Sequence, residues 1–292
     1  MKLLTKFSLL FILAAGVGLA VAAYVTYNYL QQNARQEVIQ QARLMMETSR
    51  ASRSYTSQQI EPLLKAVQDR DKVFLPQTVP GYAATESFNY LRKAYPDYTY
   101  KEATLNPTNL RDRAVDWEAD IVNNFRNNPA EKELSGERQS SLGPSLFFAR
   151  PIVADPPCLV CHSTPRAAPP PMIKRYGTAN GFGWKPGEII GAQIVSVPMS
   201  VPIAIADRTF RTILFYMAGT FLVTLLVLDL VVALIVARPV SRLSAIADQI
   251  SQGNLEVSGA QVGGSREISA LAASFERMRL SLVKAMRMLD DQ

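Results

Sequence analysis

Two long apolar segments constrain this chain more than any other feature of its sequence. Residues 7–29 carry no charge, and residues 213–236 carry only Asp229. Each run exceeds the roughly 20 apolar residues that a helix needs to cross a bilayer, so both are predicted to be transmembrane helices. The first run could instead be a cleaved signal peptide, because residues 20–22 resemble a cleavage site. Its apolar stretch is longer than such peptides usually have, and we expect an uncleaved anchor.

A compact motif contains the only two cysteines and the only histidine, as Cys158-Leu-Val-Cys161-His162. This order is the attachment motif of c-type haem, in which two thiols bond one haem and the adjacent histidine binds the iron. A redox dithiol needs no histidine and usually lies in a βαβ unit, and structural zinc needs four ligands. We therefore predict one covalent haem c per chain, anchored by Cys158 and Cys161, with His162 as an axial ligand.

The haem motif also decides the membrane topology. Lys2 and Lys6 precede the first span and Arg238 and Arg242 follow the second, which favours cytoplasmic flanks, although arginines 35, 208 and 211 compete. Since c-type haem is attached outside the cytoplasm, residues 31–210 are expected to be periplasmic. Residues 1–30 are then the cytoplasmic start and first span, residues 213–236 the second span, and residues 237–292 cytoplasmic. We expect this two-span protein in the inner membrane.

The sixth iron ligand is less constrained, since the chain has no second histidine and no third cysteine. Met45 and Met46 are candidates because adjacent methionines are unusual on a polar helix, although methionine more often fills a core. Met172 and Met199 follow the motif and are the alternatives. Lysine, tyrosine, water or an empty position also stay open.

The region between the spans has mixed periodicity. Helices are expected at 33–52, 57–70 and 85–95, and an amphipathic helix at 110–125 with Asn109 as its N-cap. Strands are expected at 98–105, 146–153 and 189–197. Because these elements do not alternate regularly, we predict an α+β fold with an antiparallel sheet and flanking helices. The Pro-rich segment around the haem motif is interpreted as a stiff loop, either a linker or a rigid collar for a bound group.

Apolar residues at sevenfold spacing mark two helices after the second span. The first carries Val236, Leu243 and Ile250, with Val240 and Ile246 on the same stripe, and Gly253 ends it. The second has spacings of three and four, through Ile268, Leu271, Phe275, Met278, Leu282, Ala285 and Leu289. No other soluble sequence is available on that side as a core. We therefore expect a parallel four-helix bundle in a homodimer.

Asp229 is the one charged residue inside the second span. A carboxylate at the bilayer centre costs roughly 2.5–3.5 kcal/mol, and less near the helix end. Asp229 either snorkels to the interface or, seven residues before Val236, faces the bundle interior and approaches its copy across the dimer. The second interpretation requires an unbroken helical phase through Arg238-Pro239, with Pro239 accommodated as a kink.

Residues 35–200 resemble the haem-c, PAS-like sensor domain of bacterial membrane signalling proteins. The resemblance rests on Arg53-x-Tyr55-Thr56 with Ile60-x-Pro62, on residues 86–92 (ESFNYLR), on Ala149-Arg150-Pro151, and most strongly on the haem motif followed by Ala168-Pro169, Tyr176-Gly177, Gly181-Phe-Gly-Trp184 and Gly187-Glu-Ile-Ile-Gly191-Ala. In that family a sulfur side chain of the first outer helix can be the distal iron ligand. The resemblance therefore points to Met45 or Met46, since no spare cysteine exists.

Residues 236–289 are similar to a HAMP linker, with Pro239 in the first helix, Gly253 after it and Glu267-Ile268 opening the second. Such linkers relay motion from membrane helices to a kinase, cyclase or chemotaxis module. None follows before Gln292, so output through a separate cytoplasmic partner is expected.

These features predict a homodimeric membrane sensor that couples haem redox state or ligand binding to the HAMP linker. The alternative is a membrane-tethered c-type cytochrome that transfers electrons to a redox partner. No pattern indicates substrate turnover, so we expect no enzymatic activity. The net charge of +6 includes no dense basic block, so nucleic-acid binding is not expected.

Overall fold

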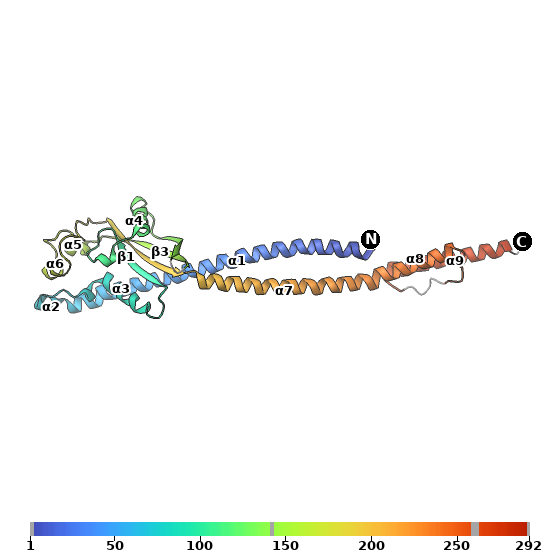
Figure 1. The fold of residues 1–292 in the computed structure, drawn as a ribbon, viewed down its shortest axis with the longest axis horizontal. Helices are drawn as coiled ribbons and strands as arrows, with labels where there is room; N and C mark the ends of the chain where they lie inside the picture. The colour runs from blue at the N-terminus through green and yellow to red at the C-terminus, as the bar shows by residue number, and fades with distance from the viewer. Residues whose placement is uncertain (1–2, 141–142, 258–262, 291–292) are drawn as a thin grey trace. The chain divides into compact units, whose positions relative to one another are not determined.

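The computed structural model describes residues 3–140, 143–257 and 263–290, so Lys2 lies outside the described residues. Contacts divide the chain into two compact units (Figure 1). The first, which we call the sheet domain, is Tyr29–Arg208. The second, the helical unit, combines Met1–Asn28 with Thr209–Gln292.

The chain begins with a long helical run. Helix α1 (Leu3–Tyr55) leads through a π-helical turn, η1 (Thr56–Ile60), into α2 (Glu61–Asp71). Residues 19–61 contain neither glycine nor proline, so no residue in this stretch breaks the backbone hydrogen bonds. Pro62 follows η1, whose wider turn is closed by a Glu61 N–H bond to the Thr56 carbonyl and accommodates the proline inside the helical run. The expected helices at 33–52 and 57–70 are confirmed.

Among its described residues, the sheet domain has four strands, all paired antiparallel in the order β1-β4-β3-β2. This confirms the predicted α+β class. Its remaining elements are η2 (Pro76–Thr78), α3 (Pro80–Leu91), β1 (Thr99–Thr104), η3 (Leu110–Asp112), α4 (Asp116–Asn127), β2 (Leu134–Ser140), β3 (Gly143–Val153), α5 (Pro156–His162), α6 (Pro170–Tyr176) and β4 (Ile189–Pro198).

Helices cover both faces of this sheet. On one face, α1 and α3 pack against alternate strand residues in a cluster of Val38, Ala42, Met46, Ala84, Phe88, Tyr100, Leu146, Phe148, Val195, Val197 and Met199. On the other, α4 packs in a cluster of Ala103, Ile121, Val122, Phe125, Ala149, Ile189, Ala192 and Ile194. Nine of the ten residues of β4 are therefore buried, as expected for a central strand with two covered faces.

Two helix predictions need correction. The helix expected at 85–95 is α3, which begins at Pro80, where proline suits the first turn, and ends at Leu91. The helix expected at 110–125 is divided into η3 and α4. Asn109 does cap, accepting from the N–H of Arg111 at 3.3 Å, but it caps η3. The chain then lies extended because Ala114 donates to the carbonyl of Thr104 in β1.

Two further segments differ from expectation. Strand β2 was not predicted, because its sequence is polar and no more than half-buried at alternate positions. The Pro-rich segment is not one loop but contains the short helices α5 and α6. Each begins with prolines in its first turn, where proline favours rather than breaks a helix.

The helical unit confirms the expected helices. It includes most of α7 (Ser200–Val232), a second π-helical turn, η4 (Ala233–Ala237), then α8 (Arg238–Ser251) and α9 (Arg266–Asp290). Two helical runs, Thr5–Asp71 and Ser200–Ser251, are long and apolar enough to cross a membrane by length and composition.

The π-helical turn η4 contradicts the unbroken helical phase expected around Pro239. Proline lacks an N–H, and its ring crowds the carbonyl four residues earlier, at Ile235 inside η4. The wider turn, closed by an Arg238 N–H bond to the Ala233 carbonyl, accommodates Pro239. Its extra residue rotates helix α8 by about 100° from the α-helical phase of α7. Asp229 itself accepts a hydrogen bond from Ser8 Oγ at 2.7 Å, within the same chain.

Helices α8 and α9 contact each other through a small part of their apolar stripes. Leu243 packs against Ile268 and Ala272, with Ile246 at the margin. Other stripe residues stay exposed on the single chain, with exposed fractions of 47% for Leu271, 51% for Met278 and 45% for Leu282. The side chain of Leu289 lies outside the described residues.

Candidate haem site

The cysteine–histidine motif lies on α5, in a segment that leaves the sheet after β3 and returns at β4. The base of the segment is closed by backbone bonds from Ala154 N–H to the Glu188 carbonyl (2.8 Å) and from Gly187 N–H to the Ala154 carbonyl (2.9 Å). On α5, positions three and four apart share one helix face. Cys158, Cys161 and His162 therefore lie together, and both thiols are free.

The imidazole of His162 is held on one nitrogen and one face. Nδ1 lies 2.7 Å from the carbonyl oxygen of Gly181, and Thr108 Oγ1 lies 3.3 Å from the same nitrogen. Because a carbonyl only accepts, Nδ1 carries the proton, and Nε2 keeps its lone pair. The ring of Trp184 stacks on the imidazole, with centroids 3.9 Å apart and an angle of 13°.

Burial keeps this imidazole in the neutral form that binds metals. Desolvation lowers the pKa of His162 below its ordinary value, although the hydrogen bond to Gly181 acts in the opposite direction. A ligating histidine typically donates its second N–H to a carbonyl or carboxylate, which fixes its tautomer and orientation. His162 has this arrangement, and its Nε2 keeps the lone pair that can bind a metal.

Glycines make the loop that carries this carbonyl. Gly181 and Gly183 both have φ of +81°, a conformation that other residues rarely adopt. A Cβ atom on Gly181 would also collide with Thr108. The loop is tied back to α5 by bonds from Gly183 N–H to the Ser163 carbonyl (3.0 Å) and from Trp184 N–H to the His162 carbonyl (3.3 Å).

The two thiols lie near the helical run of α1 and α2. Burial raises the pKa of the Cys161 thiol, and the charge of Glu61 at the start of α2 raises it further. The charge of Cys158 in turn raises the pKa of Arg53 in α1. The ring of Phe74 meets that of Tyr176 of α6 edge-on at 5.8 Å, which ties the same segment to the chain after α2.

This donor set fits a c-type haem. Two free thiols and a neutral imidazole with an available Nε2 are the groups that covalent attachment and axial ligation require. The sequence predicted all three residues, and the structure brings them to one helix face.

The four candidate methionines occupy two places. Met46 and Met199 are buried in the core cluster of α1, α3 and the sheet, and Met45 packs against the same cluster. Met172 is buried on α6, in the Pro-rich segment itself. Met46 thus has a packing role of its own.

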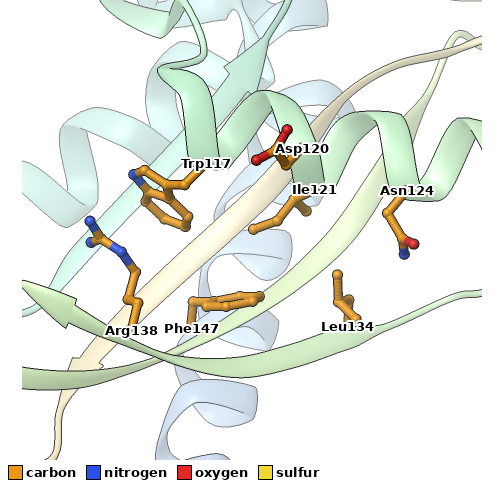
Figure 2. Close-up of a pocket in the computed structure, with 7 residues that line it drawn as sticks. All are labelled: Trp117, Asp120, Ile121, Asn124, Leu134, Arg138 and Phe147. Carbon is orange, nitrogen blue, oxygen red and sulfur yellow. The ribbon is translucent and has the colours of Figure 1, made fainter.

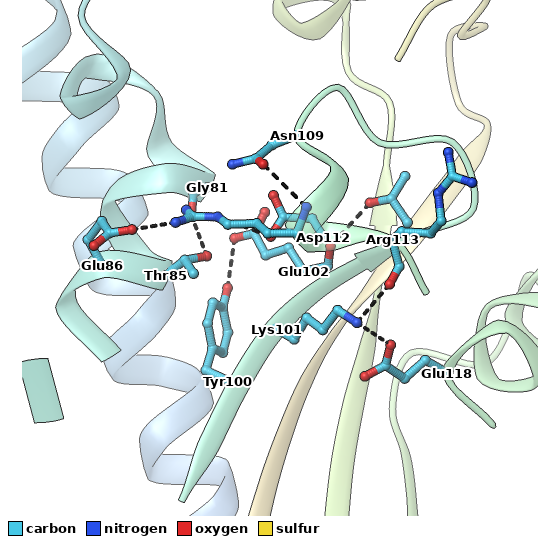
Figure 3. Close-up of polar contacts among 12 residues, drawn as sticks. Gly81, Thr85, Glu86, Tyr100, Lys101, Glu102, Asn109, Asp112, Arg113 and Glu118 are labelled. Atoms are coloured by element: carbon cyan, nitrogen blue, oxygen red, sulfur yellow. Dashed lines mark hydrogen bonds and ion pairs between the residues drawn. The ribbon is translucent and has the colours of Figure 1, made fainter. Parts of the chain in front are cut away.

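A group of ionic contacts connects α1, α3 and the end of β1, and Figure 3 shows those between α3, η3 and β1. Arg53 of α1 pairs with Glu102 at 2.5 Å, and Glu102 also accepts from Tyr100 Oη at 2.8 Å. Gln193 of β4 donates to the same hydroxyl at 3.2 Å. Burial lowers the pKa of Arg53, but the Glu102 carboxylate outweighs this effect and raises it.

Asp112 lies beside this group, and nearby positive charges offset only part of the cost of burying its carboxylate. Desolvation raises its pKa to about 6, the nearby Arg111 lowers it, and Glu102 raises it. Arg111 Nε is 3.5 Å from the Asp112 carboxylate, whereas the Arg111 guanidinium also pairs with Glu86 of α3. Asp112 is therefore protonated more easily than an ordinary aspartate.

A separate pocket of about 270 Å³ lies between α4 and strands β2 and β3 (Figure 2). Its lining residues are Trp117, Asp120, Ile121, Asn124, Leu134, Arg138 and Phe147. The Arg138 guanidinium lies over the Trp117 ring at 4.1 Å. None of these residues belongs to α5 or to the loop around Gly181, so this pocket is distinct from the haem site.

Comparison with known families covers most of the chain. The sequence profile of the Tll0287-like family matches residues 31–198. The chain belongs to the Tll0287-like family. A HAMP domain matches residues 231–284, which confirms the expected family domain followed by a HAMP segment.

The structure is also similar to "Crystal structure of the cyanobacterial heme-protein Tll0287". The identity is 14%, the TM-score is 0.43, and the match covers 56% of this chain and 95% of that chain. No curated protein matches the chain.

Sequence reasoning missed the residues that hold His162 in place. Trp184 and Gly181 belong to a Gly-Phe-Gly-Trp run to which the sequence alone assigned no role. The two glycines around an aromatic residue were the available signal, since they indicate a backbone with positive φ. Asn106 and Thr108 flank Pro107 in a turn after β1, and only the Asn-Pro turn signal marked them.

We predict that Asp112→Asn flattens the pH dependence of stability. A carboxyl whose pKa is higher in the folded than in the unfolded chain stabilises the fold at low pH and loses that effect as pH rises from about 4 to 6. The variant should gain about 2–3 kcal/mol relative to the parent at pH 7.5, and little at pH 4. Urea unfolding followed by tryptophan fluorescence measures this, because Trp117 and Trp184 both lie in the sheet domain.

The matched control is Asp97→Asn, at an exposed position outside the ionic group. It should keep the pH dependence of the parent. An Asp112→Asn variant whose stability follows the parent at both pH values would contradict the assignment.

Proposed function

We propose that this protein is a membrane-bound c-type haem sensor that passes haem redox state or ligand occupancy to its HAMP domain. The observation that carries the proposal is the geometry of His162. Its Nδ1 proton is committed to the Gly181 carbonyl, so that Nε2 is free to bind iron on the face where two free thiols lie.

The cofactor of this proposal is one haem c per chain, bonded to Cys158 and Cys161. Membership of the Tll0287-like family supports haem, because Tll0287 itself is a cyanobacterial heme-protein. The spacing of the motif supports covalent attachment. When bound, haem supplies a one-electron couple and an iron site for small ligands. The chain holds it, orients the imidazole and keeps it neutral, and we propose no enzymatic turnover.

The proposed location is the inner membrane, with the sheet domain in the periplasm. The membrane location is supported by two helices that are apolar enough to span a bilayer and by the HAMP domain. Lys6, Arg238 and Arg242 at the outer ends of the spans favour cytoplasmic flanks. Because c-type haem is attached outside the cytoplasm, the proposal places α5 on the periplasmic side of the membrane.

Coupling to the HAMP domain would use a rigid helix and a dimer. Helix α1 supplies Val38, Ala42 and Met46 to the core of the sheet domain and continues without a break to Leu3. The exposed apolar residues of α9 favour burial against a second copy in a four-helix bundle. We propose that this homodimer acts on a separate cytoplasmic partner.

Asp229 remains a candidate for signalling in this proposal. Its bond to Ser8 gives it a partner in the same chain, and this bond satisfies a carboxylate that would be costly to leave alone in a membrane. An approach of two Asp229 side chains across the dimer stays a prediction, although the π-helical turn η4 removes the register argument that suggested it.

The alternative is a membrane-tethered cytochrome that transfers electrons to a redox partner. One observation favours it. Val160, between the two cysteines on α5, is 64% exposed, and an exposed apolar side chain beside a haem suits the docking of another protein.

For the sixth ligand we propose Met45 or Met46, with Met172 as the alternative. Methionine-to-leucine variants remove the sulfur at nearly constant volume, at a usual cost below about 1.5 kcal/mol. The ferric holoprotein should show a sulfur-to-iron charge-transfer band that disappears in Met45→Leu or Met46→Leu. If both variants keep the band and Met172→Leu loses it, the assignment to α1 is wrong.

The sensor proposal predicts that the haem state changes the packing of α9. Because haem attachment consumes both native cysteines, Leu282→Cys introduces the only free thiol. Crosslinking between chains with a bis-maleimide should exceed that of the control Lys284→Cys, which lies about 200° around the helix. The yield at 282 should change at least twofold between ferric, ferrous and carbon monoxide-bound protein in nanodiscs.

Equal yields at 282 and 284 would contradict the dimer seam. Efficient crosslinking at 282 that is the same in every haem state would overturn the sensor and favour the tethered cytochrome.

A further inference from the structure

The turn after β1 reaches across the domain to the loop that holds His162. The side chain of Asn106 makes two bonds there. Its Oδ1 accepts from the N–H of Gly181 at 3.1 Å, and its Nδ2 donates to the carbonyl of Phe182 at 3.4 Å. These contacts join segments 75 and 76 residues apart in the chain.

The two bonds lie on either side of the carbonyl that His162 uses. The Gly181 N–H belongs to the preceding peptide unit and the Phe182 carbonyl to the following one, while the Gly181 carbonyl lies in the peptide unit between them. Glycine loses more conformational freedom on ordering than any other residue, and this loop has glycines at 181 and 183. One asparagine amide therefore restrains a peptide unit that its own sequence would leave free to turn.

Other contacts hold the neighbouring parts of this loop. The bonds from Gly183 and Trp184 to α5 hold the loop after residue 182, and the Trp184 ring holds the face of the imidazole. Before residue 182, Arg113 Nη2 donates to the Asn180 side chain at 3.3 Å, whereas Asn106 Oδ1 accepts from the backbone N–H of Gly181 itself.

We infer that Asn106 is a positioning residue for the iron ligand: it fixes the Gly181 carbonyl and so sets the strength of the Nδ1–H bond of His162. This inference rests on the proposed haem function. A strong Nδ1–H bond makes Nε2 a better electron donor, which favours ferric over ferrous iron. Weakening the bond raises the reduction potential.

The test uses the full-length holoprotein in nanodiscs, labelled with ¹⁵N-histidine. His162 is the only histidine in the chain, so each imidazole resonance reports on this residue alone. In the parent, the resonances should show a hyperfine shift from iron and a slowly exchanging Nδ1 proton. In Asn106→Ala that proton should exchange at least tenfold faster, with His162 still bound to iron. In the same variant the ratio of oxidised to reduced protein at a fixed potential should fall about tenfold, which corresponds to a reduction potential 59 mV higher for a one-electron couple. Dithionite is the electron source in this titration.

Asn109→Ala is the matched control. It removes another asparagine of the same turn, whose side chain bonds the N–H of Arg111 and not the His162 loop. Its proton exchange and potential should equal those of the parent. Asn106→Asp keeps the acceptor for Gly181 N–H but loses the donor to the Phe182 carbonyl, so its exchange rate should lie between those of the parent and Asn106→Ala. If Asn106→Ala does not fold, Asn106→Ser takes its place, since a hydroxyl is too short to span both backbone groups.

The outcomes separate the inference from the proposed function. Parent resonances without any hyperfine shift would show that His162 does not bind iron, and the haem function itself would fail. A shifted parent with unchanged exchange and potential in Asn106→Ala or Asn106→Ser would overturn the role of Asn106 alone. Equal effects of the Asn106 and Asn109 variants would assign the change to general loosening of the turn.

Discussion

The hydrogen bond between the Gly181 carbonyl and His162 Nδ1 organises the candidate site. It chooses one tautomer of the only histidine in the chain and leaves Nε2 as the available donor. The bond requires a loop with positive φ at two glycines, a turn after β1 that accommodates it, and an indole ring that covers the imidazole.

The rest of the sheet domain supplies the rigidity that such a bond needs. Strand β4 lies between β1 and β3 and is covered on both faces, so the segment that bears the motif starts and returns on paired strands. Ion pairs hold α1 against this frame. Arg150 of β3 pairs with Glu47 of α1 and with Glu133, both at 2.5 Å, and Arg53 pairs with Glu102. Because the side chains of Arg150 and Arg53 are mostly buried, these pairs resist solvent screening better than surface pairs do.

Helices and strands with a clear pattern of apolar residues were predictable from the sequence, whereas elements defined by long-range contacts were not. The apolar run of β4 and the helix of α1 follow from local patterns. The division between η3 and α4 depends on a bond from Ala114 to Thr104 in a neighbouring strand, which no local pattern reveals. Strand β2 is polar and gains its hydrogen bonds only from β3.

The candidate site shows the same contrast. Cys158, Cys161 and His162 are close in sequence and were predictable together, whereas Asn106, Thr108 and Gly181 reach His162 only through the fold. The resemblance to the haem-c sensor domain rests in part on Arg53, Glu86 and Arg150, but it does not explain what these side chains do. In the structure each is half of an ion pair that joins separate elements. The phase at Pro239 was mispredicted because a heptad count assumes 3.5 residues per turn, and the π-helical turn η4 does not follow that period.

The central claim is that haem is bonded to the chain through Cys158 and Cys161. The most direct test is the mass of the denatured full-length protein, produced in cells that carry out c-type haem attachment. The account predicts the mass of the polypeptide plus one haem, and the polypeptide mass alone for the Cys158→Ser/Cys161→Ser variant. Unmodified protein that denatures to the bare polypeptide mass, with its haem free in solution, would contradict it.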